Sequence, residues 1–258
     1  MTRLPLELHR LYAPTDPTLE TGEPGLVDAG GQVRAMVLEL RRPADWAALA
    51  RVWQGVQADL DLPAPAIAVS GQDGYQLWFS VAQPVPAARA IDFLDALRAR
   101  YLGDVKASRV ALWPRLDADT PTQVVHAPWV PAPQADNGRW SAFVAADLAP
   151  VFADEPWLDL PPNPDGQASL LAPLASIAPA DWQRVLDQLR PAAPAPAPSA
   201  ALPEATAPAS TSRAPAAGGG LDPKRFLLEV MNDETVALAL RVEAAKALLP
   251  YADGLGRP

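Results

Sequence analysis

Hydrophobic and polar residues alternate most regularly in the stretch YQLWFS, residues 75–80, which directly follows the polar sequence SGQDG. Successive side chains of a strand point to opposite faces, so Tyr75, Leu77 and Phe79 are expected on one face and Gln76, Trp78 and Ser80 on the other. The apolar run AIAVS precedes the turn, and the two runs together predict a β-hairpin. Gln76 is either one polar residue on a solvated strand face or part of a site.

Two other patterns place elements on either side of this hairpin. The run AMVLEL at residues 35–40 is apolar except for Glu39 and predicts a buried strand. Apolar residues then recur at spacings of three and four from Trp46 to Leu60, which predicts an amphipathic helix of about five turns. Pro43 is expected in its first turn. The sequence QPVP at residues 83–86 is expected to end the second hairpin strand.

The remaining pattern is mixed in the same way. Residues 88–102 predict a second amphipathic helix, and a last helix is expected to begin at Pro179. Short strands are expected at 109–114, 123–129 and 139–145. Strands and helices in mixed order, with a hairpin, favour an α+β fold whose mixed or antiparallel sheet is flanked by amphipathic helices.

Composition divides the chain into three parts. Residues 191–220 contain twelve alanines, seven prolines and a closing Gly triplet, and so offer almost nothing to bury. Such a segment is expected to stay extended or disordered. The sequence therefore predicts an α+β body at 1–190, a disordered linker at 191–220 and a tail at 221–258.

The tail pattern predicts two short helices that form an αα-hairpin. About 30 residues are too few to fold unaided, so this hairpin is expected to bind the body, a second copy or a protein partner. The series FLLEVMND followed by EAAKALLPY resembles a segment of phage terminase small subunits. The apolar residues expected to carry the interaction are Phe226, Leu227, Val230, Met231, Leu240 and Leu248.

Composition excludes several chemistries. The chain has no cysteine and only two histidines, which excludes zinc thiolate sites and thiol nucleophiles and argues against a histidine metal cluster. No apolar run approaches the length of a membrane span, so a cytoplasmic protein is expected. A net charge of −9 argues against wide coverage of nucleic acid. The exception is residues 95–115, where five cations face two aspartates, a pattern typical of solvated arginines.

The hairpin and its neighbours carry a family resemblance. A strand, a helix, and an S-G-x-x-G turn leading into a strand that contains L-W-F resemble the archaeo-eukaryotic primase superfamily, which includes primase-polymerases, over residues 33–115. Ser70, Gly71 and Gly74 match the turn. The resemblance implies an acidic pair for divalent metal on the first strand, a phosphate-contacting histidine after the turn, and a third carboxylate on a later strand.

This chain departs from that pattern at each chemical position. Gln76 stands where the family has its histidine, and Arg41 stands at the second acidic position beside Glu39. The strand RVALWP has no carboxylate, although Asp117 and Asp119 follow it. We therefore expect a degenerate, non-catalytic domain with no cofactor. The residues of a candidate nucleotide or nucleic-acid groove are Glu39, Ser70, Gly71, Gly74, Gln76, Trp78 and Arg109.

Three functional interpretations remain open from the sequence. The first is a non-catalytic binding or adaptor protein whose tail mediates assembly. This interpretation includes an association with nucleic acid or with a mobile element. The second is an active nucleotidyltransferase that uses Mg²⁺ or Mn²⁺ through Glu39 and one of Asp117 or Asp119. The third is a protein-interaction module with no nucleic-acid role, which the net charge favours.

Overall fold

The protein has an α+β fold, as the sequence predicts. The computed structural model describes residues 3–14, 25–117, 119–120 and 123–190. The predictions for the linker at 191–220 and the tail at 221–258 lie outside these residues. No helix in the described ranges is both long enough and apolar enough to cross a membrane.

The centre of the fold is a five-stranded sheet in the order β4-β1-β3-β2-β7, with every neighbouring pair antiparallel. The predicted hairpin is confirmed, because β2 and β3 pair directly across the SGQDG turn. A separate two-stranded ribbon is formed by β5 and β6. The strands of the main sheet are β1 (Gln32–Leu40), β2 (Ala66–Val69), β3 (Tyr75–Pro86), β4 (Val110–Trp113) and β7 (Ala142–Val144); those of the ribbon are β5 (Arg115–Leu116) and β6 (Val124–Val125).

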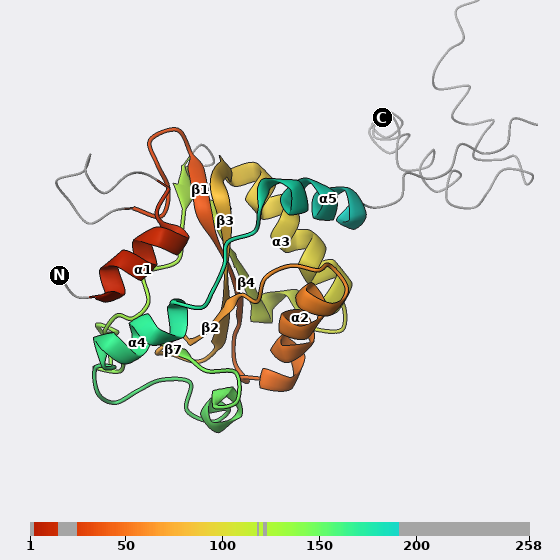
Figure 1. The fold of residues 1–258 in the computed structure, drawn as a ribbon. Coiled ribbons are helices and arrows are strands. Elements are labelled where there is room, and N and C mark those ends of the chain that lie inside the picture. Colours follow the sequence, from red (N-terminus) through yellow and green to blue (C-terminus); the bar gives the residue numbers. More distant parts are fainter. Residues whose placement is uncertain (1–2, 15–24, 118, 121–122, 191–258) are drawn as a thin grey trace, which may run out of the picture. The chain divides into compact units, whose positions relative to one another are not determined.

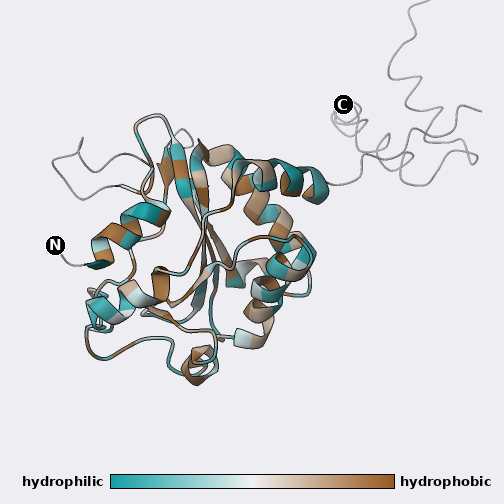
Figure 2. Cartoon of the chain, in the orientation of Figure 1, coloured by the Kyte–Doolittle hydropathy of each residue, from teal (hydrophilic) through white to brown (hydrophobic). Residues whose placement is uncertain are grey.

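Helices cover both faces of this sheet (Figure 1). On one face lie α2 (Trp46–Ala58), α3 (Ala87–Tyr101) and α5 (Pro179–Leu189), and on the other lie α1 (Arg3–Tyr12) and α4 (Pro164–Leu171). Two short 3₁₀ helices, η2 (Ala107–Arg109) and η3 (Ala149–Phe152), connect the larger elements. Both α1 and α5 mix hydrophobic with hydrophilic residues, as helices on a sheet face must (Figure 2).

The alternation in β3 assigns its side chains to two separate cores. Tyr75, Leu77 and Phe79 belong to the core beneath α2, α3 and α5. Trp78 belongs to the opposite core, together with residues of α1 and α4. The predicted division of the two strand faces is confirmed, but neither face is solvated, because residues 75–81 are all buried.

Two local predictions are wrong. The helix from Trp46 has 13 residues, fewer than five turns, and it begins after Pro43, which follows a cis peptide bond. The N-cap is Asp45, whose carboxylate accepts the N–H of Ala48, so the helix start is satisfied without Pro43. The sequence QPVP does not end β3, which continues through Pro86 and pairs with Gln32.

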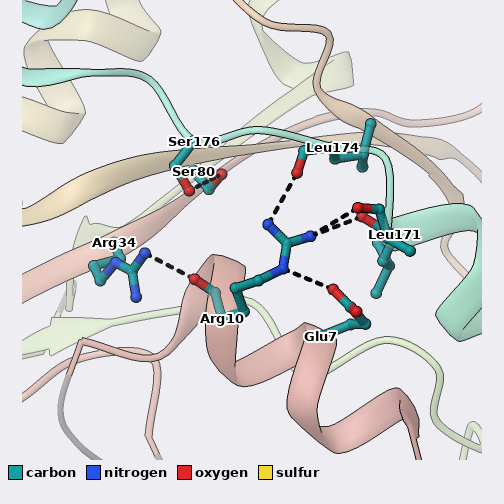
Figure 3. A network of polar contacts seen from close by, with 8 residues as sticks. Glu7, Arg10, Arg34, Ser80, Leu171, Leu174 and Ser176 are labelled. Carbon is teal, nitrogen blue, oxygen red and sulfur yellow. Dashed lines mark hydrogen bonds and ion pairs between the residues drawn. The ribbon is translucent and has the colours of Figure 1, made fainter.

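The sequence did not predict α1, which is fixed by two arginines (Figure 3). Arg34 donates from Nε to the carbonyl of Val81 at 3.0 Å, and from its two terminal nitrogens to the carbonyls of Ala13 and Arg10. Arg10 in turn donates to the carbonyls of Leu171 and Leu174, at the end of α4. Cations at helix C-termini satisfy carbonyls that the helix leaves free, so these contacts attach α1 to both the sheet and α4.

Candidate functional site

Three of the predicted site residues form one hydrogen-bonded row across the sheet. Glu39 in β1 lies directly opposite Gln76 in β3, and the Gln76 amide donates to Glu39 Oε2 at 3.2 Å. The Trp78 indole N–H donates to the other end of the same amide, Gln76 Oε1, at 2.9 Å. Gln76 therefore uses both ends of its side chain within the protein.

The row lies below the surface. Glu39 is 5% exposed, Gln76 4% and Trp78 1%. Burial raises the pKa of Glu39, because the charged form loses hydration, and the nearby Arg41 opposes this shift in part. Arg41 Nε lies 3.4 Å from Glu39 Oε1, and the Arg41 side chain is 43% exposed. Arg41 is thus the only solvent-facing member of the row Arg41–Glu39–Gln76–Trp78.

Aromatic rings close over the inner end of this row. The Trp78 ring centroid lies 5.2 Å from Tyr12 of α1 and 6.0 Å from Phe143 of β7. The ring of His126 lies 6.5 Å away, and its Nε2, 3.0 Å from the Ala35 carbonyl, acts as a donor there. Burial lowers the pKa of His126, which favours the neutral imidazole. Trp78 is thus in a packed core and presents no face to a ligand in this structure.

The SGQDG turn has a structural role at each of its predicted positions. Ser70 Oγ accepts backbone N–H groups from Gln72, Asp73 and Gly74 at 3.0–3.2 Å. Gly71 has a φ of +78°, and a Cβ there would lie 2.7 Å from the Ser141 nitrogen. A Cβ at Gly74 would collide with the Leu40 carbonyl. The glycines are therefore required by close backbone approach, independently of any ligand.

Arg109 lies apart from the buried row, at the neighbouring edge of the sheet. Its carbonyl accepts the Arg41 N–H at 2.7 Å, and its guanidinium donates to the Pro43 carbonyl at 2.7 Å. Arg41 and Arg115 both lie over the ring of Trp113, with their Cζ atoms 5.6 and 5.7 Å from its centroid. The structure thus joins the backbones of Arg109 and Arg41, and no hydrogen bond joins the Arg109 side chain to Gln76.

The chemistry available around Glu39 is limited to hydrogen bonding and charge. Its cross-strand neighbours are Gln76 on one side and Ala111 on the other, so neither adjacent strand offers a second carboxylate in register. Within the described ranges, no group of three or more His, Asp or Glu residues is placed to hold a metal ion. Asp117 is used locally, since its Oδ1 accepts the N–H groups of Asp119 and Thr120.

Comparisons with known proteins give little further guidance. No known protein-family profile matches the chain, and no curated protein matches it. Among solved structures, the polymerase domain from Mycobacterium tuberculosis Ligase D in complex with DNA aligns with a TM-score of 0.33 and 17% identity. The alignment covers 62% of this chain and 56% of that chain, so this protein spans little more than half of that domain.

Sequence reasoning missed two contributors to this region. His126 lies beside Trp78 although 48 positions separate them, and a lone histidine in a short apolar run gave no signal of that contact. Tyr12 of α1 covers Trp78, and α1 was not predicted at all. The spacing Leu4, Leu8, Leu11, Tyr12 is a helical stripe that could have revealed it.

Proposed function

We propose that this protein is a non-catalytic binding protein, with its α+β body as a scaffold and its C-terminal segment as an assembly element. The supporting observation is the use of Glu39, the one carboxylate that the primase resemblance would assign to metal. One of its oxygens accepts the Gln76 amide, the other is paired with Arg41, and the residue is buried. A carboxylate in these contacts is occupied by the protein's own side chains.

The position of Arg41 adds a second support. Nucleotidyl transfer needs carboxylates that bridge divalent ions to a triphosphate, and two such ions lie about 3.5–4 Å apart. The side chain paired with Glu39 is a guanidinium 3.4 Å away, which repels a divalent cation. We infer that an ancestral catalytic position, if the resemblance reflects descent, has become a structural ion pair.

The test is a transfer assay on the full chain. Primer extension and dinucleotide synthesis are measured with Mn²⁺ or Mg²⁺, beside an active primase-polymerase as positive control. We expect no product above background from the natural chain or from Glu39→Ala, with folding of both checked by circular dichroism. Metal-dependent product that Glu39→Ala abolishes would overturn the proposal in favour of the nucleotidyltransferase.

A binding assay separates the two non-catalytic interpretations. Binding of single-stranded DNA that weakens steeply with salt would favour a nucleic-acid adaptor, because phosphate contacts release counterions. No binding at low salt would favour the protein-interaction module, in keeping with the net charge of −9. Removing residues 221–258 and measuring the molar mass in solution tests whether the tail mediates assembly.

A further inference from the structure

The antiparallel register shows which backbone groups point out of the sheet at each edge. Arg41 N–H donates to the Arg109 carbonyl, so residues of β4 with odd numbers face β1. The backbone N–H and carbonyl groups of even-numbered β4 residues therefore point away from β1, out of the sheet. By the same reasoning, the backbone groups of Phe143 point out of the sheet at β7. The backbone groups of even-numbered β3 residues point away from β1.

Two of these edges are closed by the protein itself. At β7, the amide of Gln167 accepts the Phe143 N–H at 2.8 Å and donates to the Phe143 carbonyl at 2.9 Å. Gln167 thereby takes the place of a neighbouring strand. At β3, Ile177 bonds to Ser80 and Ala82, and the next outward positions are Pro84 and Pro86, which have no N–H to offer.

The third edge, β4, is left open by the residues that the structure describes. The outward N–H and carbonyl of Leu112 form no hydrogen bond with any described residue. The N–H of Val110 is bonded to Ala107, but no described residue bonds to the Val110 carbonyl. Unpaired strand edges of this kind are templates for an added strand. The exposed groups match one short extended segment, since each strand residue advances about 3.3 Å.

Arginines lie at both ends of this edge strand. Arg109 and Arg115 flank β4 in the sequence, and Arg41 lies over Trp113 at its end. Neither Arg109 nor Arg115 forms an ion pair with a described carboxylate, although one nitrogen of Arg109 donates to the Pro43 carbonyl. Guanidinium groups recognise carboxylates through paired N–H donors, so an added strand with acidic side chains would find partners at both of its ends.

We propose that β4 is a strand-addition site for an extended acidic segment of a partner protein. Backbone hydrogen bonds to Leu112 supply the pairing, and the arginines supply the selection for acidic side chains. A second copy of this chain is a poor occupant, because an antiparallel β4–β4 pair brings Arg109 of one copy toward Arg115 of the other. This proposal specifies the class of partner for the binding protein proposed above, and it depends on that proposed function.

The direct test follows individual amides of the full chain by NMR hydrogen exchange. The probe is a soluble peptide of alternating glutamate and valine. On binding, exchange of the Leu112 N–H should slow, while the N–H groups of Ala111 and Trp113, already bonded to β1, serve as internal controls and stay unchanged. The same peptide with N-methyl groups on its pairing edge should not protect Leu112.

Charge selection is tested by titration of a fluorescent form of the same peptide. Arg115→Glu should weaken binding about tenfold, equivalent to ~1.4 kcal/mol. The matched control is Arg89→Glu, since Arg89 is also exposed and free of any described ion pair but lies on α3. A lysine–valine peptide should bind less tightly than the glutamate–valine peptide.

Each contrary outcome overturns the proposal. If the lysine–valine peptide bound as tightly as the glutamate–valine peptide, selection for acidic side chains would be refuted. The same would follow if the Arg115→Glu chain bound the glutamate–valine peptide as tightly as the natural chain. Binding that survives N-methylation would show charge attraction without strand addition. Self-association of the natural chain that protects the Leu112 N–H without added peptide would identify a second copy as the occupant. Nucleotidyl transfer in the assay above would refute the proposed function while peptide protection of Leu112 persisted, so the two failures are distinguishable.

Discussion

The two faces of the central sheet are buried by different means. Beneath α2, α3 and α5 the buried side chains are hydrophobic, among them Phe79, Phe93 and Trp182. Beneath α1 and α4 the face combines a smaller hydrophobic core with the row Arg41–Glu39–Gln76–Trp78. Burial of apolar area is favourable without direction, whereas buried polar groups must find partners of fixed geometry.

The difference assigns separate roles to the two faces. The apolar face supplies most of the stabilisation, and the polar face fixes which strands lie next to each other, because Glu39 and Gln76 can bond only in the observed register. A slip of one residue would bury both groups without partners. The variants below test this division, beginning with the one expected to cost most.

The largest loss is expected on the apolar face. Phe93 is fully buried, with its ring centroid 5.0 Å from Trp182 and 5.7 Å from Phe79. Phe93→Ala should lower the free energy of unfolding by about 4 kcal/mol, through lost burial and a residual cavity. Urea denaturation measures the loss, with Phe93→Leu as the control that retains most of the volume. A loss below that of any polar-face variant would refute the division.

Attachment of α1 should come next. Arg34→Met removes donors from the carbonyls of Val81, Ala13 and Arg10 while keeping an apolar stem. We expect a loss of about 2 kcal/mol, as for hydrogen bonds to a charged group. The control Arg51→Met breaks the exposed pair with Asp104 and should cost at most about 1 kcal/mol. Equal losses for the two variants would show that Arg34 does not hold α1.

A smaller loss is expected within the polar row. Trp78→Phe keeps an aromatic ring but removes the indole N–H, so Gln76 Oε1 is left buried without its donor. The hydrogen-bond part of the loss is expected to be about 1.5 kcal/mol, and the smaller ring adds a cavity cost to it. In a double-mutant cycle with Gln76→Met, the combined loss should be less than the sum, because the double variant contains neither the Gln76 acceptor nor the Trp78 donor, while the contact of Gln76 with Glu39 is lost in both Gln76 variants. Additive losses would show that this hydrogen bond contributes nothing.

The sequence predicted the sheet better than it predicted what covers the sheet. Alternation in β3 identified both faces, because a strand has a strict period of two. It could not show that both faces are buried, since α1 and the 127–143 segment come from distant parts of the chain. The sequence QPVP predicts a strand end, yet Pro84 and Pro86 fit β3 because their nitrogens face the side away from β1.

The candidate site was predicted in part for the same reason. Glu39 and Gln76 were named from their positions in two apolar strands, and the register places them side by side. The burial of Trp78, at the inner end of the row, depends on Tyr12, Phe143 and His126, whose contacts arise only in the tertiary structure. Binding through Ser70, Gly71, Gly74 and Arg109 stays a prediction.

The smallest and most specific effect concerns the charge of Glu39. Burial raises the pKa of this carboxyl above its value in the unfolded chain, so the folded state binds the proton more tightly. The contribution of Glu39 to stability is therefore complete at low pH and is lost as the pH rises through the folded-state pKa. Glu39→Gln keeps the shape and removes the charge, so it should raise the free energy of unfolding at pH 7.

This gain should shrink as the pH falls and approach zero below the pKa of the unfolded carboxyl. The measurement is urea denaturation of natural and Glu39→Gln chains over the same pH series. His126, whose pKa is lowered by burial, makes both chains less stable in acid, and the difference between the two curves cancels that contribution. A gain that stays constant with pH would mean that Glu39 does not titrate differently on folding, and a loss at pH 7 would make the pair with Arg41 stabilising.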